Sequence, residues 1–125
     1  DLSALTEVGG QVYIYYSEDL ENLYMASLEE VGSSFYVYGS QQMETLELDS
    51  LTEVNGSMTL GYNTGLETFA APILETLNGS LNIQENTSLN GVDLSSLCGI
   101  SDFTIEGNDL SEDDQYDLLV QLTSC

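Results

Sequence analysis

Apolar residues recur along this chain at a fixed interval of twenty-three positions. Four copies align without gaps: "LTEVGGQVYIYYSEDLENLYMAS" from Leu5, "LEEVGSSFYVYGSQQMETLELDS" from Leu28, "LTEVNGSMTLGYNTGLETFAAPI" from Leu51 and "LETLNGSLNIQENTSLNGVDLSS" from Leu74. A shortened fifth copy, "LCGISDFTIEGNDL", starts at Leu97. Repeats of about 20–29 residues with this many fixed apolar positions indicate a solenoid with β-strands in each coil.

The apolar positions of the copies form columns that we expect to face the interior. Alternation with a period of two is what a half-buried strand requires, and Gly, Asn and Ser on either side are turn signals. The first two columns are Leu5, Leu28, Leu51, Leu74, Leu97 and Val8, Val31, Val54, Leu77, Ile100. A first strand gives Val12, Phe35, Met58, Leu81, Phe103 and Ile14, Val37, Leu60, Ile83, Ile105. A second, short strand gives Leu23, Leu46, Phe69, Val92 and Met25, Leu48, Ala71, Leu94.

The end of the chain reads as a helical cap on the last coil. Ser111 is a plausible N-cap residue, and three acidic residues in the first turn favour a helix start. We expect Tyr116, Leu119, Val120 and Leu122 to cover the last coil. The sequence thus predicts one mostly β domain over residues 1–125, with about 4.5 coils at 5–27, 28–50, 51–73, 74–96 and 97–110 and a helical cap at 111–125.

The motif "L-x-x-V-G-G-x-V-x-I … L-x-x-L" resembles the receptor L domain family, over nearly the whole chain. That family is a leucine-rich-repeat-like, right-handed β-solenoid. It occurs in insulin and epidermal growth factor receptor ectodomains and in glycosylphosphatidylinositol-anchored fungal cell-wall proteins. The resemblance implies a right-handed solenoid, but no single function, because its members bind peptides, build walls or do neither.

The chain contains 22 acidic residues and no Lys, Arg or His, which gives a net charge of −22. This charge repels nucleic acid and anionic membranes, and it favours cationic partners, divalent ions or neutral sugars. The missing residue types remove imidazole bases, lysine Schiff bases and arginine phosphate clamps, so we expect a protein that is not an enzyme. A two-carboxylate glycosidase is chemically permitted, although no acidic pair stands apart from the acidic background.

Three N-x-S/T sequons occur, at Asn55, Asn78 and Asn86. Asn55 and Asn78 occupy the same repeat position, so glycans there would lie on one edge of consecutive coils. Asn86 lies near a turn position where solenoids often use asparagine to bond the backbone. Sequons arise by chance, but three of them in a cysteine-containing chain without a transmembrane run favour an extracellular, secreted or cell-wall glycoprotein. We find no signal peptide, as expected of a mature form.

Two cysteines lie near the end of the chain, Cys98 at the start of the fifth coil and Cys125 at the last position. An oxidising compartment favours a disulfide between them, which would hold the cap helix in place. The alternative is a pair of reduced thiols in the core.

Acidic residues also repeat, with Glu7, Glu30 and Glu53 in one position and Glu21, Glu44 and Glu67 in another. Neighbouring carboxylates in such ladders repel, and a bound cation would relieve the repulsion. The two readings are a solvated acidic face and a weak calcium site; no EF-hand or RTX-type loop is present. No other cofactor is expected.

The strands of the first two coils carry tyrosines at outward positions: Tyr13, Tyr15, Tyr36 and Tyr38, with Tyr16, Tyr24 and Tyr62 nearby. They are either cross-strand packing on a solvated sheet or a contact surface for sugars or another subunit. The first coil also lacks a cap, which leaves Leu5 and Val12 as further interface candidates. The alternative is a ragged or clipped end.

These features predict an extracellular structural glycoprotein that self-associates through its first coil into a layer, wall or filament. The alternative is a receptor-L-type recognition module that binds a peptide or glycan on its sheet face. Concentration-dependent assembly favours the first reading, and a saturable monomeric complex favours the second. Nucleic-acid binding and membrane insertion are not expected.

Overall fold

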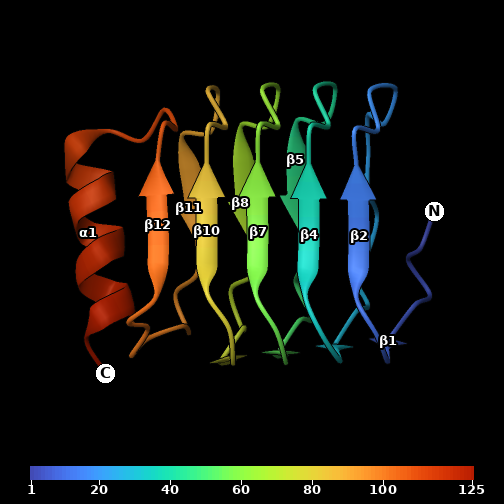
Figure 1. The fold of residues 1–125 in the computed structure, drawn as a ribbon, viewed down its shortest axis with the longest axis horizontal. Coiled ribbons are helices and arrows are strands. Elements are labelled where there is room, and N and C mark those ends of the chain that lie inside the picture. Colours follow the sequence, from blue (N-terminus) through green and yellow to red (C-terminus); the bar gives the residue numbers. More distant parts are fainter.

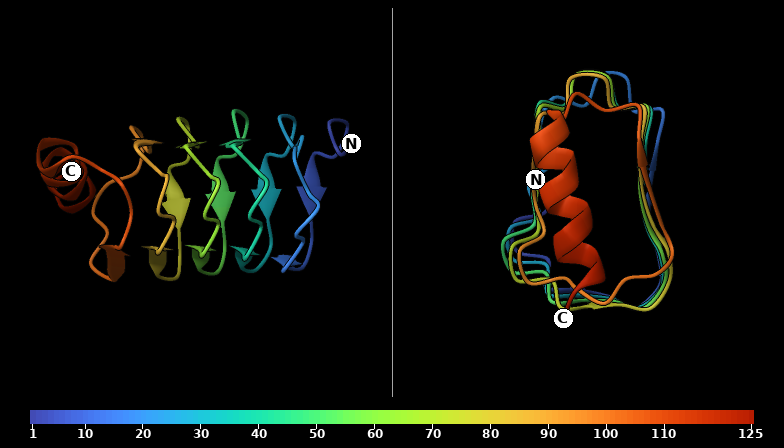
Figure 2. Two further views of the ribbon diagram at one scale, coloured as in Figure 1. Left: turned by 90° about the horizontal axis from the view of Figure 1, so that it is seen from above. Right: turned by 90° about the vertical axis from the view of Figure 1, so that its left-hand side faces the viewer.

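The computed structural model describes all 125 residues and forms a parallel β-solenoid of about four turns, closed at one end by a single helix (Figure 1). The expectation of a mostly β solenoid with a C-terminal helix is therefore confirmed. The second, third and fourth coils each run through three sheets, and the coils superpose closely when viewed along the stack (Figure 2).

The longest strands form a five-stranded parallel sheet in the order β12-β10-β7-β4-β2. Its members are β2 (Val12–Tyr15), β4 (Phe35–Tyr38), β7 (Met58–Gly61), β10 (Leu81–Gln84) and β12 (Phe103–Glu106). Neighbouring strands pair residues 23 positions apart, such as Val37 with Leu60 and Leu60 with Ile83. The last pairing joins Ile83 to Ile105, because the fifth copy is one residue shorter at this point.

Two further sheets complete the wall of the solenoid. Two-residue strands form one sheet: β1 (Glu7–Val8), β3 (Glu30–Val31), β6 (Glu53–Val54) and β9 (Thr76–Leu77). The other contains β5 (Thr45–Glu47), β8 (Thr68–Ala70) and β11 (Gly91–Asp93). The strand predicted around Leu23 in the first coil is not formed. Leu23 is only partly buried, so less apolar surface holds this segment against β5.

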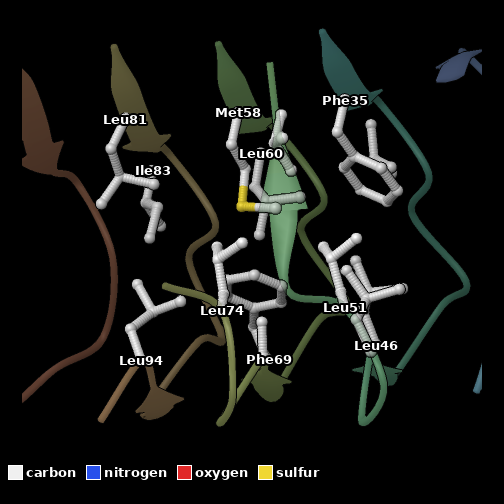
Figure 3. Packing of buried hydrophobic residues seen from close by; sticks show 14 of the residues in the cluster. Phe35, Leu46, Leu51, Met58, Leu60, Phe69, Leu74, Leu81, Ile83 and Leu94 are labelled. Carbon is white, nitrogen blue, oxygen red and sulfur yellow. The ribbon is translucent and has the colours of Figure 1, made fainter. Parts of the chain in front are cut away.

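The predicted columns do face the interior. Leu28, Leu51 and Leu74 are fully buried, and 26 buried apolar side chains form one cluster (Figure 3). A fully buried leucine contributes about 1.5–3 kcal/mol of transfer free energy, so each complete coil adds stability to its neighbours. In the first coil, Leu5 and Ile14 remain partly exposed, whereas Val12 is buried and offers little surface to a partner.

The cap helix α1 (Glu112–Thr123) begins at the predicted N-cap, where the Oγ of Ser111 accepts a hydrogen bond from the Asp114 amide at 3.1 Å. Its buried residues are Leu118 and Leu122, which lie one turn apart on the same face. The expectation that Leu119 and Leu122 cover the last coil is confirmed, since Leu122 is buried and Leu119 packs against the core. The expectation for Tyr116 and Val120 is wrong, because both are exposed and lie about half a turn from Leu118.

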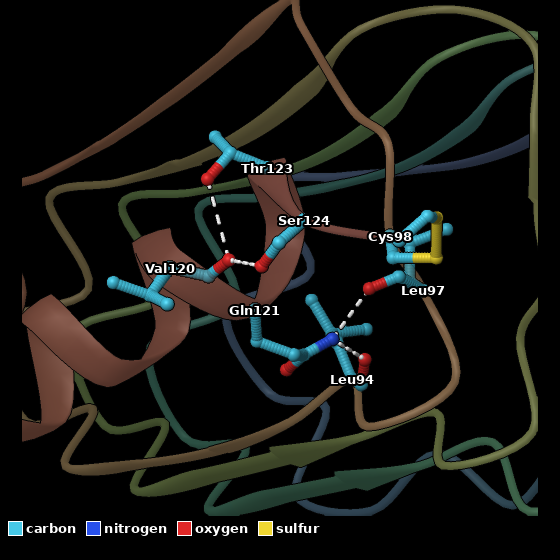
Figure 4. Close-up of a disulfide and its surroundings, with 8 residues drawn as sticks. Leu94, Leu97, Cys98, Val120, Gln121, Thr123 and Ser124 are labelled. Atoms are coloured by element: carbon cyan, nitrogen blue, oxygen red, sulfur yellow. Dashed lines mark hydrogen bonds between the residues drawn. A yellow bond between two sulfur atoms is a disulfide. The ribbon is translucent and has the colours of Figure 1, made fainter.

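Several bonds hold α1 across the end of the stack. Cys98 and Cys125 form the predicted disulfide, with 5.3 Å between their Cα atoms (Figure 4). The Gln121 side-chain amide donates to the carbonyl oxygens of Leu94 and Leu97. The helix therefore covers the last apolar layer through few side chains and one covalent link. With 12 residues, α1 falls short of the length and apolarity that a membrane crossing requires.

Candidate functional site

Six tyrosine rings form one continuous cluster over the first three coils, which we call the tyrosine platform. Its members are Tyr13, Tyr15, Tyr16, Tyr36, Tyr38 and Tyr62. Tyr13 stacks on Tyr36 with ring centroids 4.8 Å apart and planes at 10°. Tyr15 stacks on Tyr38 at 5.4 Å and 18°. The parallel register of β2 and β4 sets this spacing, since it places each pair directly side by side.

The stacking orients the rings edge outward. Because Tyr13 and Tyr36 face each other across the strands, the ring faces between them are occupied and their edges meet the solvent. Tyr38 lies over Gly61, where an added Cβ would come within 2.7 Å of its ring. A glycine is therefore required there. The platform therefore presents mainly ring edges and hydroxyls, with an open ring face at Tyr13 on the edge strand β2.

Two platform tyrosines sit at a backbone position that favours glycine. Tyr16 and Tyr62 have φ angles of 50° and 53°, and the same repeat position carries Gly39 and Gly107 in other coils. A left-handed conformation costs a residue with a side chain roughly 1–2 kcal/mol. The fourth coil has Glu85 at this position, with a φ of 57°, so the turn accepts residues other than glycine. Tyrosine in the first and third coils extends the cluster of rings along the turn.

The sheet that carries the platform is nearly free of charge. Of the 22 acidic residues, only Glu106 lies on its five strands. The outward residues of β2, β4, β7 and β10 are Tyr13, Tyr15, Tyr36, Tyr38, Thr59, Gly61, Asn82 and Gln84. On a molecule of net charge −22, this surface, which we call the neutral face, is where a second macromolecule meets the least repulsion. Sequence reasoning found the tyrosines but missed the neutrality of the face.

The packing of the platform disfavours phenolate formation. Hydrogen bonding with Tyr16, burial and the neighbouring phenols raise the pKa of Tyr15 from 10.0 to about 12. Burial and neighbouring phenols also raise the pKa of Tyr36 and of Tyr38. The folded protein therefore keeps these three phenols protonated at pH values where they would ionise in the unfolded chain.

Alkaline pH should destabilise the protein through these phenols. A raised folded-state pKa contributes stability that is complete below pH 10 and is lost as the pH rises toward about 12. Phenolate absorbance should show Tyr15 ionising late in the titration. Tyr16→Phe, which removes the largest cause, should move that step to lower pH, and Tyr116→Phe should leave it unchanged. An unchanged titration of the Tyr16 variant would contradict the assignment.

A second ladder, made of asparagine side chains, runs through the turn after the long strands. Asn86 donates through Nδ2 to the Leu60 carbonyl at 3.0 Å and to Oδ1 of Asn108 at 3.0 Å. Its Oδ1 accepts from the backbone N–H of Asn63 at 3.1 Å and from the Asn63 side chain at 3.2 Å. Asn86 is 0% exposed, so the structure removes it from the candidate glycan acceptors. Its amide satisfies buried backbone groups instead.

The other two sequon asparagines are exposed, but each residue of their Asn-Gly-Ser motifs also helps to stack the coils. The Asn78 amide donates to Oδ1 of Asn55 at 2.9 Å. The Ser57 hydroxyl accepts from the Ser80 backbone N–H at 3.0 Å. A Cβ at Gly79 would lie 2.6 Å from the preceding coil's backbone, so only glycine fits. Stacking therefore explains the repeated motif without a glycan, and glycosylation remains a prediction.

Expression in a eukaryotic secretory host tests the remaining sequons. We expect a glycan on Asn55 or Asn78 and none on Asn86, because only the first two amides reach solvent. Their 2.9 Å hydrogen bond leaves little room for two glycans side by side, so single occupancy should predominate. Peptide mapping before and after deglycosylation provides the measurement. An occupied Asn86 in folded protein would contradict the structure.

The repeated carboxylates lie in adjacent coils, as the sequence predicts. Glu7, Glu30 and Glu53 are direct neighbours along β1, β3 and β6. The backbone N–H of Glu67 donates to the carbonyl oxygen of Glu44 at 2.8 Å. Glu21 and Glu44 line one recess. No group of three or more acidic side chains gathers in a way that could hold a metal ion. The repeated carboxylates therefore do not support a calcium site.

The largest recess, of about 420 Å³, lies between β11 and α1. Val92, Leu110 and Leu118 form its apolar part, and Asp114 and Asp117 stand at the helix side. Both carboxylates belong to exposed residues on one helix, and no bound group points to a ligand. The tyrosine platform on the neutral face is therefore the stronger candidate.

Comparison with protein-family models, with curated proteins and with solved structures finds no match for this chain.

Proposed function

We propose that this protein is a non-enzymatic, extracellular structural glycoprotein that associates with further copies of itself through the neutral face. The observation that carries the proposal is the position of the platform: six tyrosines lie on the one sheet whose strands are almost free of carboxylates. Tyrosine supplies a large contact area and a polar tip at a low cost in conformational entropy.

A second copy is the occupant that the charges favour. Two chains of net charge −22 repel each other in most orientations, and face-to-face packing of the two neutral faces keeps the remaining carboxylates furthest apart. A twofold arrangement of this kind uses the same patch on both molecules. Packed sheets lie about 10 Å apart, so interdigitated tyrosine edges would fill the space between them.

The extracellular location is supported by the disulfide between Cys98 and Cys125, since disulfides persist mainly in oxidising compartments. Exposed Asn55 and Asn78 offer glycan acceptors on a different part of the coil from the platform.

Sedimentation at low and high salt tests the proposal. Association should strengthen as salt rises, because screening removes the repulsion between carboxylates and leaves the tyrosine contact. Tyr13→Ser/Tyr36→Ser should shift the protein toward monomer. The control variant Tyr24→Ser/Tyr116→Ser alters two tyrosines outside the platform that are at least as exposed, and it should leave association unchanged. A wild-type protein that stays monomeric at every salt concentration would refute self-association.

A recognition module like the receptor L domains is the second candidate. Thr59, Asn82 and Gln84 lie beside the tyrosines on the neutral face and offer hydrogen bonds to a neutral glycan or peptide. It ranks second because sugar stacking needs open ring faces, and those of the platform are largely engaged with each other. Saturable binding of a neutral glycan by monomeric protein would favour this function.

A further inference from the structure

The surface of this protein offers oxidants only one abundant kind of reactive side chain. The chain contains no Trp and no His, and its two cysteines are joined in a disulfide. The three methionines, Met25, Met43 and Met58, are at most 1% exposed. One-electron oxidants that reach the folded protein from solvent therefore meet the phenol groups of tyrosine.

Six of the eight tyrosines are close enough to pass a radical formed on one of them to another. Platform neighbours lie between 4.2 Å (Tyr15 to Tyr16) and 6.2 Å (Tyr15 to Tyr36) apart, measured between ring centroids. At such separations a neighbouring phenol can give an electron and its proton to a tyrosyl radical, so a radical formed on one ring can pass to the others. Tyr24 and Tyr116 have no ring partner. The platform thus concentrates oxidation that starts anywhere within it.

The ring geometry decides where a new bond can form. A bond between two phenols joins the ring carbons beside the hydroxyls, so it brings two ring edges together. Across the strands, Tyr13 and Tyr36 are stacked, and Tyr15 and Tyr16 meet edge to face, so neither pair joins two edges. Tyr13 and Tyr16 are more than half exposed, so the ring edges of a second molecule can reach them.

We propose that the tyrosine platform is a site of oxidative phenol coupling, at which a peroxidase and hydrogen peroxide join two copies of this protein by a dityrosine bond. The proposal rests on the proposed function, because two platforms must meet for the bond to form. The most exposed platform phenols, Tyr13 at 56% and Tyr16 at 53%, are the expected coupling residues.

The reaction balances with hydrogen peroxide as the oxidant. Each of two tyrosines gives one electron and its phenolic proton to the peroxidase, which hydrogen peroxide has oxidised. The two tyrosyl radicals combine at ring carbons ortho to the oxygen, and the displaced ring hydrogens move to the oxygens and restore both phenols. The peroxide takes up two electrons and two protons and leaves as two molecules of water.

Treatment of the full chain with a haem peroxidase and hydrogen peroxide tests the proposal. We expect a covalent dimer on denaturing gels that carries dityrosine fluorescence. Peptide mapping needs cleavage at acidic residues, because the chain has no Lys or Arg for trypsin. The cross-link should map to Tyr13 and Tyr16.

Variants distinguish coupling that is specific to the platform from coupling that depends only on how exposed a tyrosine is. Tyr24 and Tyr116 are 57% and 67% exposed, more than any platform residue, so exposure alone would make them the coupling sites. Tyr24→Phe/Tyr116→Phe should nevertheless retain the cross-linked dimer. Tyr13→Phe/Tyr16→Phe should lose most of it, and replacing all six platform tyrosines by Phe should abolish it. Circular dichroism verifies the fold of each variant. Cross-links that map to Tyr24 or Tyr116 would overturn the proposal.

Phenylalanine variants also separate coupling from association. Phenylalanine retains the stacked ring but cannot form a dityrosine. The variant in which all six platform tyrosines are replaced by Phe should therefore still self-associate without cross-linking. Wild-type protein that associates but yields no dityrosine overturns the coupling and leaves the proposed function standing. Dityrosine confined to the monomer also overturns coupling between copies. Platform cross-links formed by a protein that sediments as a monomer support the coupling and refute stable association.

Discussion

Asn86→Ala should lower the free energy of unfolding by about 1–3 kcal/mol, because it leaves a buried backbone N–H without a partner. The Asn63 N–H loses its acceptor, and the Leu60 carbonyl keeps only its ladder bond to β10. Urea denaturation gives the measurement. The midpoint should fall, and the slope should stay constant if the unfolded state is unchanged.

Asn78→Ala is the matched control for this effect. It deletes the same amide from another sequon, but Asn78 is exposed and makes a single side-chain hydrogen bond, to Asn55. Its expected cost is about 1 kcal/mol or less. Equal destabilisation by the two variants would contradict the distinction between a buried asparagine ladder and an exposed sequon.

Removal of the disulfide should cost about 3–4 kcal/mol, the chain-entropy value for a loop of 27 residues. The cap helix depends on this link because Leu118 and Leu122 are its only buried side chains. Without the link, α1 should undock more readily and expose the apolar layer of the last coil, including Leu97. Denaturation of Cys98→Ser/Cys125→Ser beside the wild type measures the loss.

Reductant provides a control for the disulfide effect. It should lower the stability of the wild type to that of the double serine variant and leave the variant itself unchanged. A wild-type denaturation midpoint that does not respond to reductant, in protein whose thiols are shown to be free, would mean that packing alone holds α1 in place.

The sequence predicted the solenoid because each copy satisfies the same local constraints. Leu28, Leu51 and Leu74 could be placed in the core from spacing alone, since a coil that buries one of them must bury the others. For these leucines the repeat converts sequence distance directly into distance in space. The disulfide between Cys98 and Cys125 was predicted differently, from the oxidising compartment that the sequons indicate.

Features that depend on direction rather than on spacing were harder to predict. Leu119 and Leu122 were assigned correctly to the apolar face of α1. Tyr116 and Val120 were wrongly added to it and Leu118 was missed, because all are apolar and nothing local distinguishes the two sides. The burial of Asn86 was hinted at by its turn position, but an N-x-S/T pattern carries no sign of exposure. The motif "NGS" at Asn55 and Asn78 suggested glycans, while its glycine and serine serve the contact between coils.

The candidate site was visible in the sequence only in part. Alternation in "VYIYY" and "FYVYG" placed tyrosines on the outer side of the sheet. That their rings stack face to face, and present edges, depends on the exact pairing of β2 with β4. The neutrality of the face emerges only when the outward residues of all five strands are considered together.

The register of the coils is the claim on which the platform, the ladders and the cap depend, and NMR contacts between backbone protons test it most directly. The structure predicts contacts from Val37 to Leu60 and from Leu60 to Ile83, each 23 residues apart. It also predicts a change to 22 residues at the last strand, from Ile83 to Ile105. Contacts at other offsets, or contacts confined to neighbours within each repeat, would contradict the fold.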